Sequence, residues 1–530
     1  MRVLLLSTPY PLEENVAPPL SLAYLAAILE REGFEVEILD FLVSRYRPAK
    51  LRQKLEEFRP QLVGATCVTI TYQTAARLLK VCKDFDPDII TAIGGPHVSF
   101  TVEETFRRAP WIDVIAIGEG DHTVVDLAKA VDGGGDIAGV PGIAFHDGAT
   151  VVRTEPRPYI QDLDQLPLPA RHLLSMSRYV ALGSACTMVT SRGCPYSCIF
   201  CSANGMFGRK VRFRDPGLVV DEVEMLHRDY DFVQINIVDD TFTVNHNHTR
   251  GVCEEMLRRD LKATWSAYAR VDTMREDVAK LMHRAGCKWV LFGVESGNEG
   301  ILKTVKKGIN RDKVRAGVRI ATEAGLKVFN SFIFGLPGES PETAQESMSF
   351  AKELAEDYGV AYGFHILAPM PGTPLYDRAG DYGIRLLTRD WSRHDANRVI
   401  TELPTISVET MKGVVGSYEE HVEKAREDVR RRAALGEEEY AVMVLGEEKQ
   451  GLMWDLFKGD VIETVGRVSR AGARDDDAAT SVLAQRVARR TGHPIEMVEK
   501  QVGSLVAGGL LRLEAGGDGL RWRWTDGRRT

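Results

Sequence analysis

The sequence lacks a long uncharged apolar segment, and this absence argues against a transmembrane helix. No window of about 18 residues is predominantly apolar and free of charge, as a membrane-spanning helix would require. The first apolar run, from Val3, is too short for a signal peptide and is followed at once by Pro9 and Pro11. We expect no transmembrane segment, and peripheral contact with a membrane stays open.

Cysteine is scarce, and neither sign of charge is in large excess. Eight cysteines among 530 residues, three of them in one loop, do not form a disulfide framework and indicate the reducing cytoplasm. The formal net charge of −8 gives no electrostatic reason to expect nucleic acid as a partner. The hydrophobic content of 44% is sufficient for two or three domains, each with its own core. We expect a cytoplasmic monomer.

What the sequence does contain is a short loop with Cys194, Cys198 and Cys201, rich in Gly, Pro and Ser. Thiolates are soft ligands, and three of them on one loop can bind three irons of an iron–sulfur cube. A structural zinc site would need four closed ligands, and Cys186 lies in the preceding apolar run. We interpret the loop as a 4Fe–4S site with one iron open to a substrate or cofactor. Zinc or incidental thiols are the alternatives.

Strand-like apolar runs alternate with amphipathic stretches in residues 1–150. This alternation predicts an α/β fold with a doubly wound parallel sheet, which binds ligands at the carboxyl ends of its strands. Ordinary turn glycines are the alternative interpretation of the glycines found there. The predicted strands are 3–7, 36–39, 62–68, 89–93 and 114–117, and the residues after them that would line a site are Thr69, Thr71, Gly94, Gly95, His97, Gly118, Glu119 and Gly120.

A second strand–helix alternation follows the cysteine loop, over residues 181–400. Together with the run leading to Cys194 it gives six strands, too few for a closed eight-stranded barrel and suited to a partial (β/α)6 barrel. Each strand ends in polar residues, where such barrels place their catalytic groups. The predicted strands are 232–238, 264–269, 289–294, 328–334 and 362–368, and the polar residues include Asp239, Asp240, Arg270, Glu295, Ser296 and Asn330.

The remaining segments are a linker at 151–180, a charged helical connector at 401–435, and a small domain at 436–530. In the last of these, helices followed by a hairpin around Gly516–Gly519 predict a winged-helix-like domain. Trp522 and Trp524 lie two apart and therefore on one side of a strand. We expect that side to pack and the domain to close the mouth of the barrel; an outward-facing recognition site is the alternative.

The cysteine spacing C-x3-C-x2-C, with Phe200 before the third cysteine, resembles that of the radical S-adenosylmethionine (SAM) enzymes. The segment Pro18–Ala23 with the later GGPH and GEGD motifs is similar to the cobalamin-binding domain that precedes the radical SAM domain in one large subfamily. That subfamily includes cobalamin-dependent methyltransferases and the anaerobic Mg-protoporphyrin oxidative cyclase. The resemblance implies three cofactors: a 4Fe–4S cluster, S-adenosyl-L-methionine and cobalamin.

The resemblance also implies roles for residues. Asp239 and Asp240 would bind the amino group of SAM, and Arg270 its carboxylate. The GVESG motif, with Glu295 and Ser296, would lie near the ribose and methionine moieties. The further SAM and cluster contacts would be Asn330 and Phe200. Because the loop Thr8–Pro18 contains no His, the lower face of cobalamin would meet Thr69, Thr71 and Tyr72 instead.

The function that the resemblance implies is methylation of an unactivated carbon, by means of a 5′-deoxyadenosyl radical and methylcobalamin. The alternatives are a non-methylating oxidoreductase, cyclase or ring-rearranging enzyme of the same family, and a non-catalytic cobalamin or redox sensor. The expected partners are a small-molecule or peptide substrate and an electron donor such as flavodoxin or ferredoxin.

Overall fold

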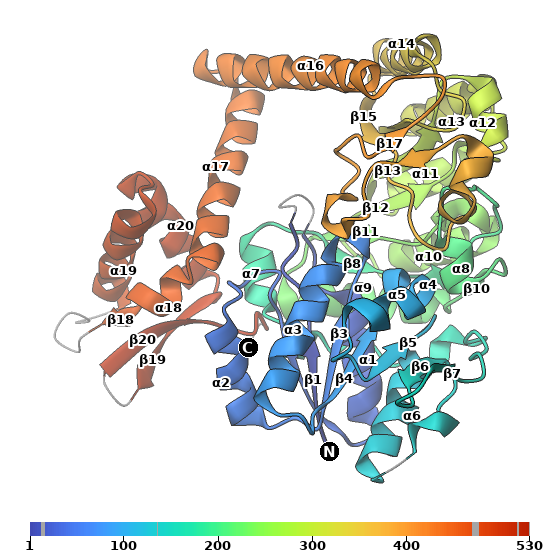
Figure 1. Cartoon of the computed structure of the whole chain (residues 1–530). Coiled ribbons are helices and arrows are strands. Elements are labelled where there is room, and N and C mark those ends of the chain that lie inside the picture. Colours follow the sequence, from blue (N-terminus) through green and yellow to red (C-terminus); the bar gives the residue numbers. More distant parts are fainter. Residues whose placement is uncertain (12–15, 135, 469–475, 517–518, 529–530) are drawn as a thin grey trace.

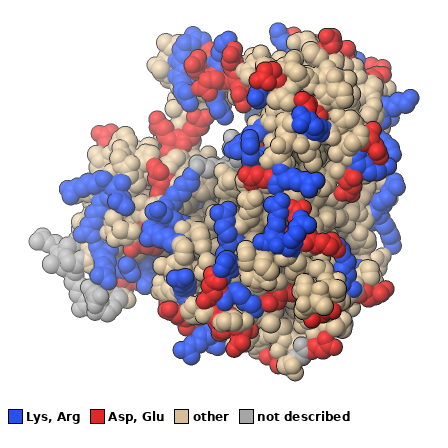
Figure 2. Space-filling view, viewed as in Figure 1, with Lys and Arg blue, Asp and Glu red and all other residues tan. Residues whose placement is uncertain are grey.

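The computed structural model describes residues 1–530 except 12–15, 135, 469–475, 517–518 and 529–530. Its three main sheets have seven, six and three strands (Figure 1). Among the described residues, no helix is both long enough and apolar enough to span a bilayer. On the face seen in Figure 2, acidic and basic side chains are interspersed.

The N-terminal sheet has the strand order β2-β1-β3-β4-β5-β6-β7, and its first five strands are parallel. Alternate residues of β1 face opposite helix layers: Val3 and Leu5 pack with α1 and α6, and Leu4 and Leu6 pack with α2 and α3. The predicted doubly wound sheet is therefore confirmed. Its elements are β1 (Arg2–Leu6), α1 (Leu20–Arg31), β2 (Glu35–Leu39), α2 (Pro48–Phe58), β3 (Leu62–Thr66), α3 (Tyr72–Phe85), β4 (Ile90–Gly94), α4 (Pro96–Phe100), α5 (Val102–Arg108), β5 (Val114–Ala116), α6 (Asp121–Asp132), β6 (Ile143–His146) and β7 (Val151–Arg153).

The second sheet has six parallel strands in the order β15-β14-β13-β12-β11-β8 and does not close, as predicted for a partial barrel. Two short strands, β9 (Ser191–Arg192) and β10 (Arg212–Phe213), pair beside it. Its strands are β8 (Cys186–Met188), β11 (Gln234–Ile237), β12 (Thr264–Ala269), β13 (Cys287–Glu295), β14 (Lys327–Phe334) and β15 (Ala361–Ile366). Its helices are α7 (Met176–Ala181), α8 (Ala203–Phe207), α9 (Pro216–Tyr230), α10 (His246–Arg258), α11 (Glu276–Arg284), α12 (Glu299–Thr304), α13 (Arg311–Glu323), α14 (Pro341–Tyr358) and α15 (Pro374–Asp377).

Two long helices connect the barrel to a C-terminal module beside the N-terminal sheet (Figure 1). They are α16 (Val408–Ala434) and α17 (Glu438–Lys458). The module contains a three-stranded antiparallel sheet in the order β18-β20-β19, in keeping with the predicted helices and hairpin, whose turn residues 517–518 lie outside the described residues. Its elements are α18 (Val461–Val465), β18 (Arg467–Val468), α19 (Asp476–Thr491), α20 (Ile495–Ala507), β19 (Leu511–Gly516) and β20 (Gly519–Trp524).

The two tryptophans of β20 pack, as expected, but the module does not lie where we expected it. Trp522 is buried, and Trp524 lies 5.2 Å from the ring of Phe457. The guanidinium of Arg178, in α7, lies over the Trp524 ring, and Arg528 donates to the hydroxyl of Tyr230 at the end of α9. These contacts attach the module to the linker and to the amino-terminal side of β11. They do not place it over the barrel mouth.

Candidate functional site

The three cysteines lie on one loop that is held closed by its own backbone. The loop starts after β9 and ends before β10, and the amide of Cys194 donates to the carbonyl of Gly208 at 3.2 Å. Gly193 has φ +106°, and a Cβ there would lie 2.7 Å from the carbonyl oxygen of Lys210. Only glycine permits this turn.

The three thiols have different exposure. Cys194 and Cys198 are half-buried, and Cys201 is exposed. Among the described residues, no three His, Cys, Asp or Glu side chains are arranged to hold a single metal ion. Convergence on one ion is what a structural zinc site needs, whereas the ligands of a cube bind separate irons. Three cysteines on one loop are the ligand number that a cube with one open iron needs, and one fewer than a closed structural zinc site needs.

Two buried cations lie next to the loop 193–211, which carries the three cysteines and is called the cluster loop here. The guanidinium of Arg270 lies 3.6 Å from the ring centre of Tyr196 and donates to the carbonyl of Lys307 at 2.8 Å. The ammonium of Lys307 donates to Glu295 at 2.6 Å, and Glu295 has a left-handed backbone with φ +73°. Burial raises the pKa of the Cys198 thiol, while Lys307 and Arg270 act in the opposite direction. Arg270 and Glu295 are thus brought together beside the loop through Lys307, and their predicted contacts with SAM stay a prediction.

The two carboxylates after β11 have different surroundings. Asp239 is 1% exposed and accepts hydrogen bonds from the amide and hydroxyl of Thr190, both at 2.6 Å, and from the Ser191 hydroxyl at 2.7 Å. It holds the segment that leads into the cluster loop. Asp240 lines a cavity, where burial and the neighbouring Asp239 raise its pKa to about 6. Of the pair, Asp240 is the carboxylate that faces open space.

The structure does not bring Asn330 or the Ser296 side chain to the cluster loop. Asn330 is fully buried between Phe292 and Tyr362, on the face of β14 that packs against α13 and α14. Because side chains alternate along a strand, its neighbour Ser331 takes the opposite face. The Ser296 hydroxyl lies 3.2 Å from that of Ser347 on α14. Phe200 is half-buried, 6.0 Å from the ammonium of Lys307.

A cavity of about 360 Å³ lies at the carboxyl ends of the N-terminal strands. Glycines form much of its wall, as the sequence predicted, and Val68 replaces the expected Thr69, Thr71 and Tyr72. The cavity extends between the sheet and α1 and α6. Its other wall belongs to the barrel. The lining includes Gly64, Gly94, Gly95, Gly118, Glu119, Gly120 and Asp121 on one side, and Val189, Ser191, Arg192, Val238 and Asp240 on the other.

The side chain of His97 points away from this cavity into a buried aromatic stack. Its ring lies 4.6 Å from that of Tyr72 and 4.9 Å from that of Trp391, which comes from the segment after the barrel. Nδ1 of His97 lies 3.3 Å from the Thr69 hydroxyl, and Thr71 caps the turn by bonding to the backbone of Val68. These four predicted cofactor contacts are thus used for packing and for joining the two sheets.

Comparison with known proteins decides the family. Residues 14–128 match the B12 binding domain, and residues 188–351 match the radical SAM superfamily. An uncharacterized methyltransferase of Pyrococcus horikoshii is 36% identical over 381 residues, which cover 72% of this chain and 82% of the relative. The chain belongs to the radical SAM superfamily. A second relative of this radical SAM protein, the anaerobic magnesium-protoporphyrin IX monomethyl ester cyclase of Rubrivivax gelatinosus, is 32% identical over 375 residues, covering 69% of this chain and 66% of the cyclase.

Solved structures share the fold of this radical SAM protein. The cobalamin-dependent SAM radical enzyme OxsB, with aqua-cobalamin and SAM bound, superimposes with a TM-score of 0.69 at 17% identity and covers 98% of this chain and 82% of its own. The radical SAM methyltransferase TsrM of Kitasatospora setae, with cobalamin and a [4Fe-4S] cluster, gives 0.63 at 23% identity, covering 73% of this chain and 81% of its own. The predicted fold class and family are confirmed.

The cavity wall of this radical SAM protein fits a flat, bulky cofactor such as cobalamin. Nothing lies within 4 Å of the place where a Cβ on Gly118 would be, so a side chain there would project into open space. A Cβ on Gly64 would reach to 3.0 Å from Leu5. Gly95, with φ +114°, would place its Cβ 2.3 Å from the carbonyl oxygen of Cys67. Of these three glycines, Gly118 leaves space open for a ligand, whereas Gly64 and Gly95 are required by close packing against Leu5 and Cys67.

Four residues at these sites were not anticipated from the sequence. Lys307 stands in a run of charged residues that looks like an exposed surface segment. Arg192 and Arg212 flank the cluster loop, where a basic residue carries no motif of its own. Trp391 lies in a polar loop far along the chain. Their positions depend on contacts with residues far away in the sequence. Only the three-dimensional structure, in which they are buried, therefore reveals their place at these sites.

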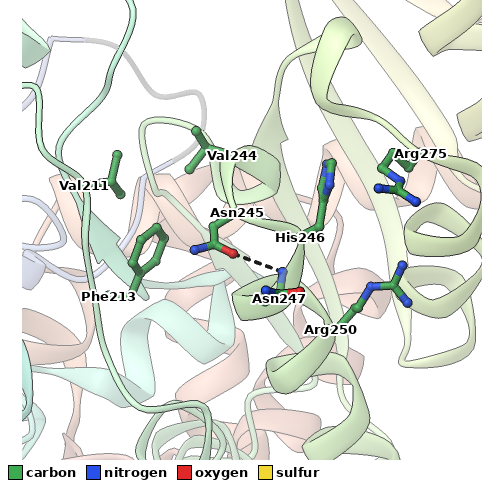
Figure 3. A pocket seen from close by; sticks show the side chains of 8 residues that line it. All are labelled: Val211, Phe213, Val244, Asn245, His246, Asn247, Arg250 and Arg275. Carbon is green, nitrogen blue, oxygen red and sulfur yellow. Dashed lines mark hydrogen bonds between the residues drawn. The ribbon is translucent and has the colours of Figure 1, made fainter.

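A separate hollow of about 450 Å³ lies near the start of α10. Figure 3 shows Arg250, Arg275 and His246 around it, with Asn245 accepting a hydrogen bond from the backbone of Asn247. Both arginines already pair with Asp277, and His246 lies 2.9 Å from the carbonyl of Thr273. These polar groups are engaged with the protein, and none of the predicted site residues lies here.

Proposed function

We propose that this chain is a cobalamin-dependent radical SAM methyltransferase that adds a methyl group to an unactivated carbon of a small molecule or peptide. The observation that carries the proposal is that the glycine-walled cavity and the cluster loop adjoin. Arg192 lines the cavity and stands two residues before Cys194, and Asp240 lines it too. Both cofactors would therefore face one space. Methyltransferases among the relatives support this choice.

When bound, the cluster would supply the electron that splits SAM, and cobalamin would carry the methyl group. The chain's own residues would bind the cluster and orient SAM beside it. Cys194, Cys198 and Cys201 would hold the cluster. The guanidinium of Arg270 already binds Asp272 through Nε and a terminal nitrogen, at 3.0 and 3.1 Å, so a SAM carboxylate would bind Arg270 beside Asp272. Asp240 suits the ammonium group of SAM. Lys307 fixes the carboxylate of Glu295 beside them.

The residues that line the cavity determine whether a protein side chain could bind the cobalt of cobalamin. Among the described lining residues there is no His, and the exposed side chain at the end of β3 is Val68. Residues 12–15 of the loop Thr8–Pro18 lie outside the described residues, but their sequence contains no His. We propose that the protein supplies no imidazole ligand to cobalt.

The test uses SAM with a trideuterated methyl group and anaerobically reconstituted protein. Methyl transfer to carbon should give a product carrying the intact label, with equal amounts of S-adenosylhomocysteine and 5′-deoxyadenosine. Transfer of the label without any 5′-deoxyadenosine would contradict a radical mechanism.

The second candidate is a radical cyclisation or other oxidation without methyl transfer. It is favoured by the cyclases of Rubrivivax gelatinosus and Cereibacter sphaeroides, which are 32% and 30% identical. Such a reaction would release 5′-deoxyadenosine and no S-adenosylhomocysteine. The ratio of the two products therefore separates the two candidates in one assay.

We also propose that a cytoplasmic one-electron donor, flavodoxin or ferredoxin, reduces the cluster, and that the enzyme is a monomer. Cys201 is the exposed one of the three cysteines, which supports electron entry to the cluster through this residue. Replacing dithionite by reduced flavodoxin should sustain SAM cleavage. Size-exclusion chromatography with light scattering should give the mass of one chain, 58.8 kDa.

A further inference from the structure

A buried ionic cluster joins the N-terminal sheet to the cluster loop. Glu119, in the GEGD motif after β5, accepts hydrogen bonds from Arg212 at 2.9 Å and from Arg192 at 3.5 Å. Arg192 also donates to Asp121, the last residue of the same motif, at 2.8 and 3.1 Å. The backbone amide of Ile160 donates to Glu119 at 2.9 Å. One carboxylate thus collects groups from the barrel and the linker.

The two arginines stand at opposite ends of the cluster loop. They are direct partners in the antiparallel pair β9–β10, and the loop 193–211 runs between them. Arg212 also donates to the carbonyls of Phe207 and Ile160 at 2.9 and 2.6 Å, so it ties the end of α8 to the linker. Glu119 holds Arg212, and Asp121 with a longer contact from Glu119 holds Arg192, so the carboxylates of one motif fix both ends of the loop.

The four charged side chains that join the sheet to the cluster loop are two acids and two arginines, and all four are buried. The side chains of Glu119, Asp121, Arg192 and Arg212 are 3%, 7%, 11% and 3% exposed. Burial alone would lower the pKa of Arg192, but Asp121 and Glu119 outweigh it and the pKa lies above its ordinary value. Removing the charge of Glu119 leaves two buried guanidinium groups with one carboxylate. Because an uncompensated buried charge is costly, the arginines would move toward water.

We propose that Glu119 is a positioning residue that sets where the cluster loop stands relative to the cofactor cavity. Glu119, Asp121 and Arg192 all line that cavity, so the contact that anchors the loop is part of the cavity wall. The identity of the two cofactors rests on the proposed function. The anchoring of the loop does not, and it can be tested on the protein without cofactors.

The first experiment measures hydrogen–deuterium exchange of the full chain without cofactors. The variant Glu119→Gln keeps the size of the side chain and an acceptor for Ile160 but removes the charge. We expect amides of the loop 193–211 to exchange at least tenfold faster. The matched control is Glu222→Gln, because Glu222 also binds two buried arginines, Arg171 and Arg214, and is 0% exposed. Neither of these ion pairs of Glu222 involves a residue of the loop 193–211. Glu222→Gln should therefore change the exchange rates of the loop amides less than threefold.

The second experiment measures the distance between cob(II)alamin and the reduced cluster by pulsed electron paramagnetic resonance. The wild type and Glu222→Gln should give one narrow distance distribution, and Glu119→Gln should give one at least twice as broad. Arg212→Lys, which keeps the charge but loses the two-pronged bond, should fall between them. The proposal would be overturned if Glu119→Gln and Glu222→Gln gave the same exchange rates for the amides of the loop 193–211 and the same width of the distance distribution between cobalt and the iron–sulfur cluster. If the protein bound no cobalamin, the proposed function would fail while the exchange result would still decide the anchoring.

Discussion

Replacing His97 by Phe should remove an acid sensitivity of the N-terminal sheet and leave cobalamin binding intact. The imidazole is 1% exposed, and its Nε2 has no hydrogen-bond partner among the described residues. Burial, with smaller contributions from His394 and Arg108, lowers the pKa of His97 to about 3. The folded protein therefore holds this ring neutral at pH values where the unfolded chain protonates it.

The sign and size of the effect follow from proton linkage. Below the ordinary histidine pKa of about 6.5, the unfolded chain binds one more proton at this position, so acid favours unfolding. Each pH unit in this window costs about 1.4 kcal/mol, which gives about 2 kcal/mol between pH 6.5 and pH 5. For a domain of about 150 residues, such as the N-terminal one, this loss of about 2 kcal/mol in unfolding free energy lowers Tm by about 4–8 °C. The loss continues as the pH falls toward the folded pKa and then levels off.

The assay is the thermal unfolding of wild type and His97→Phe between pH 5 and pH 8, with cobalamin affinity measured at pH 7.5. The variant keeps a ring between Tyr72 and Trp391 and loses the contact with Thr69. The difference between the two proteins should change by about 2 kcal/mol across the acid range. His146→Gln, at the exposed end of β6, should behave as wild type. Parallel pH profiles, or a loss of cobalamin binding in His97→Phe, would refute a purely packed and neutral His97.

Three further predictions concern the cofactor sites. Cys198→Ala should lose the 4Fe–4S cluster and SAM cleavage by iron analysis and product assay, whereas Cys253→Ala, in the core, should keep both. Bound cob(II)alamin should show no nitrogen coupling from a histidine by electron paramagnetic resonance, and Val68→His should introduce it because Val68 is 42% exposed in the cavity. Gly95→Ala should abolish soluble, cobalamin-binding protein, since its Cβ would lie 2.3 Å from a backbone oxygen; normal yield and affinity would show that this turn can relax.

The strands could be predicted from the sequence because buried parallel strands appear as short apolar runs. Predicted and observed bounds differ little, as for Thr264–Ala269, where they coincide. The glycines of the cavity were predictable for a similar reason: their position after a strand determines where their backbone lies. Cys194, Cys198 and Cys201 needed only their spacing, since one loop carries them all.

Side-chain direction could not be predicted in the same way. For Asn330 a shift of one residue reverses the face of the strand, and an apolar run does not reveal which face is inner. His97 and Glu119 follow their strands as predicted, but their side chains bind partners hundreds or tens of residues away: Trp391 for the first, Arg192 and Arg212 for the second. Such partners lie beyond any local pattern.

The stack of His97 on Trp391 has a consequence for protein engineering. A chimera that exchanges the N-terminal residues between two relatives would carry His97 and Tyr72 but leave Trp391 behind in the recipient. Trp391 is fully buried in the core of the N-terminal sheet although it follows the last barrel strand. The segment to be exchanged is therefore not one contiguous stretch of sequence. A graft that transplants Trp391 and its flanking loop with the first segment should fold, where a cut at the linker would leave an indole-sized hole.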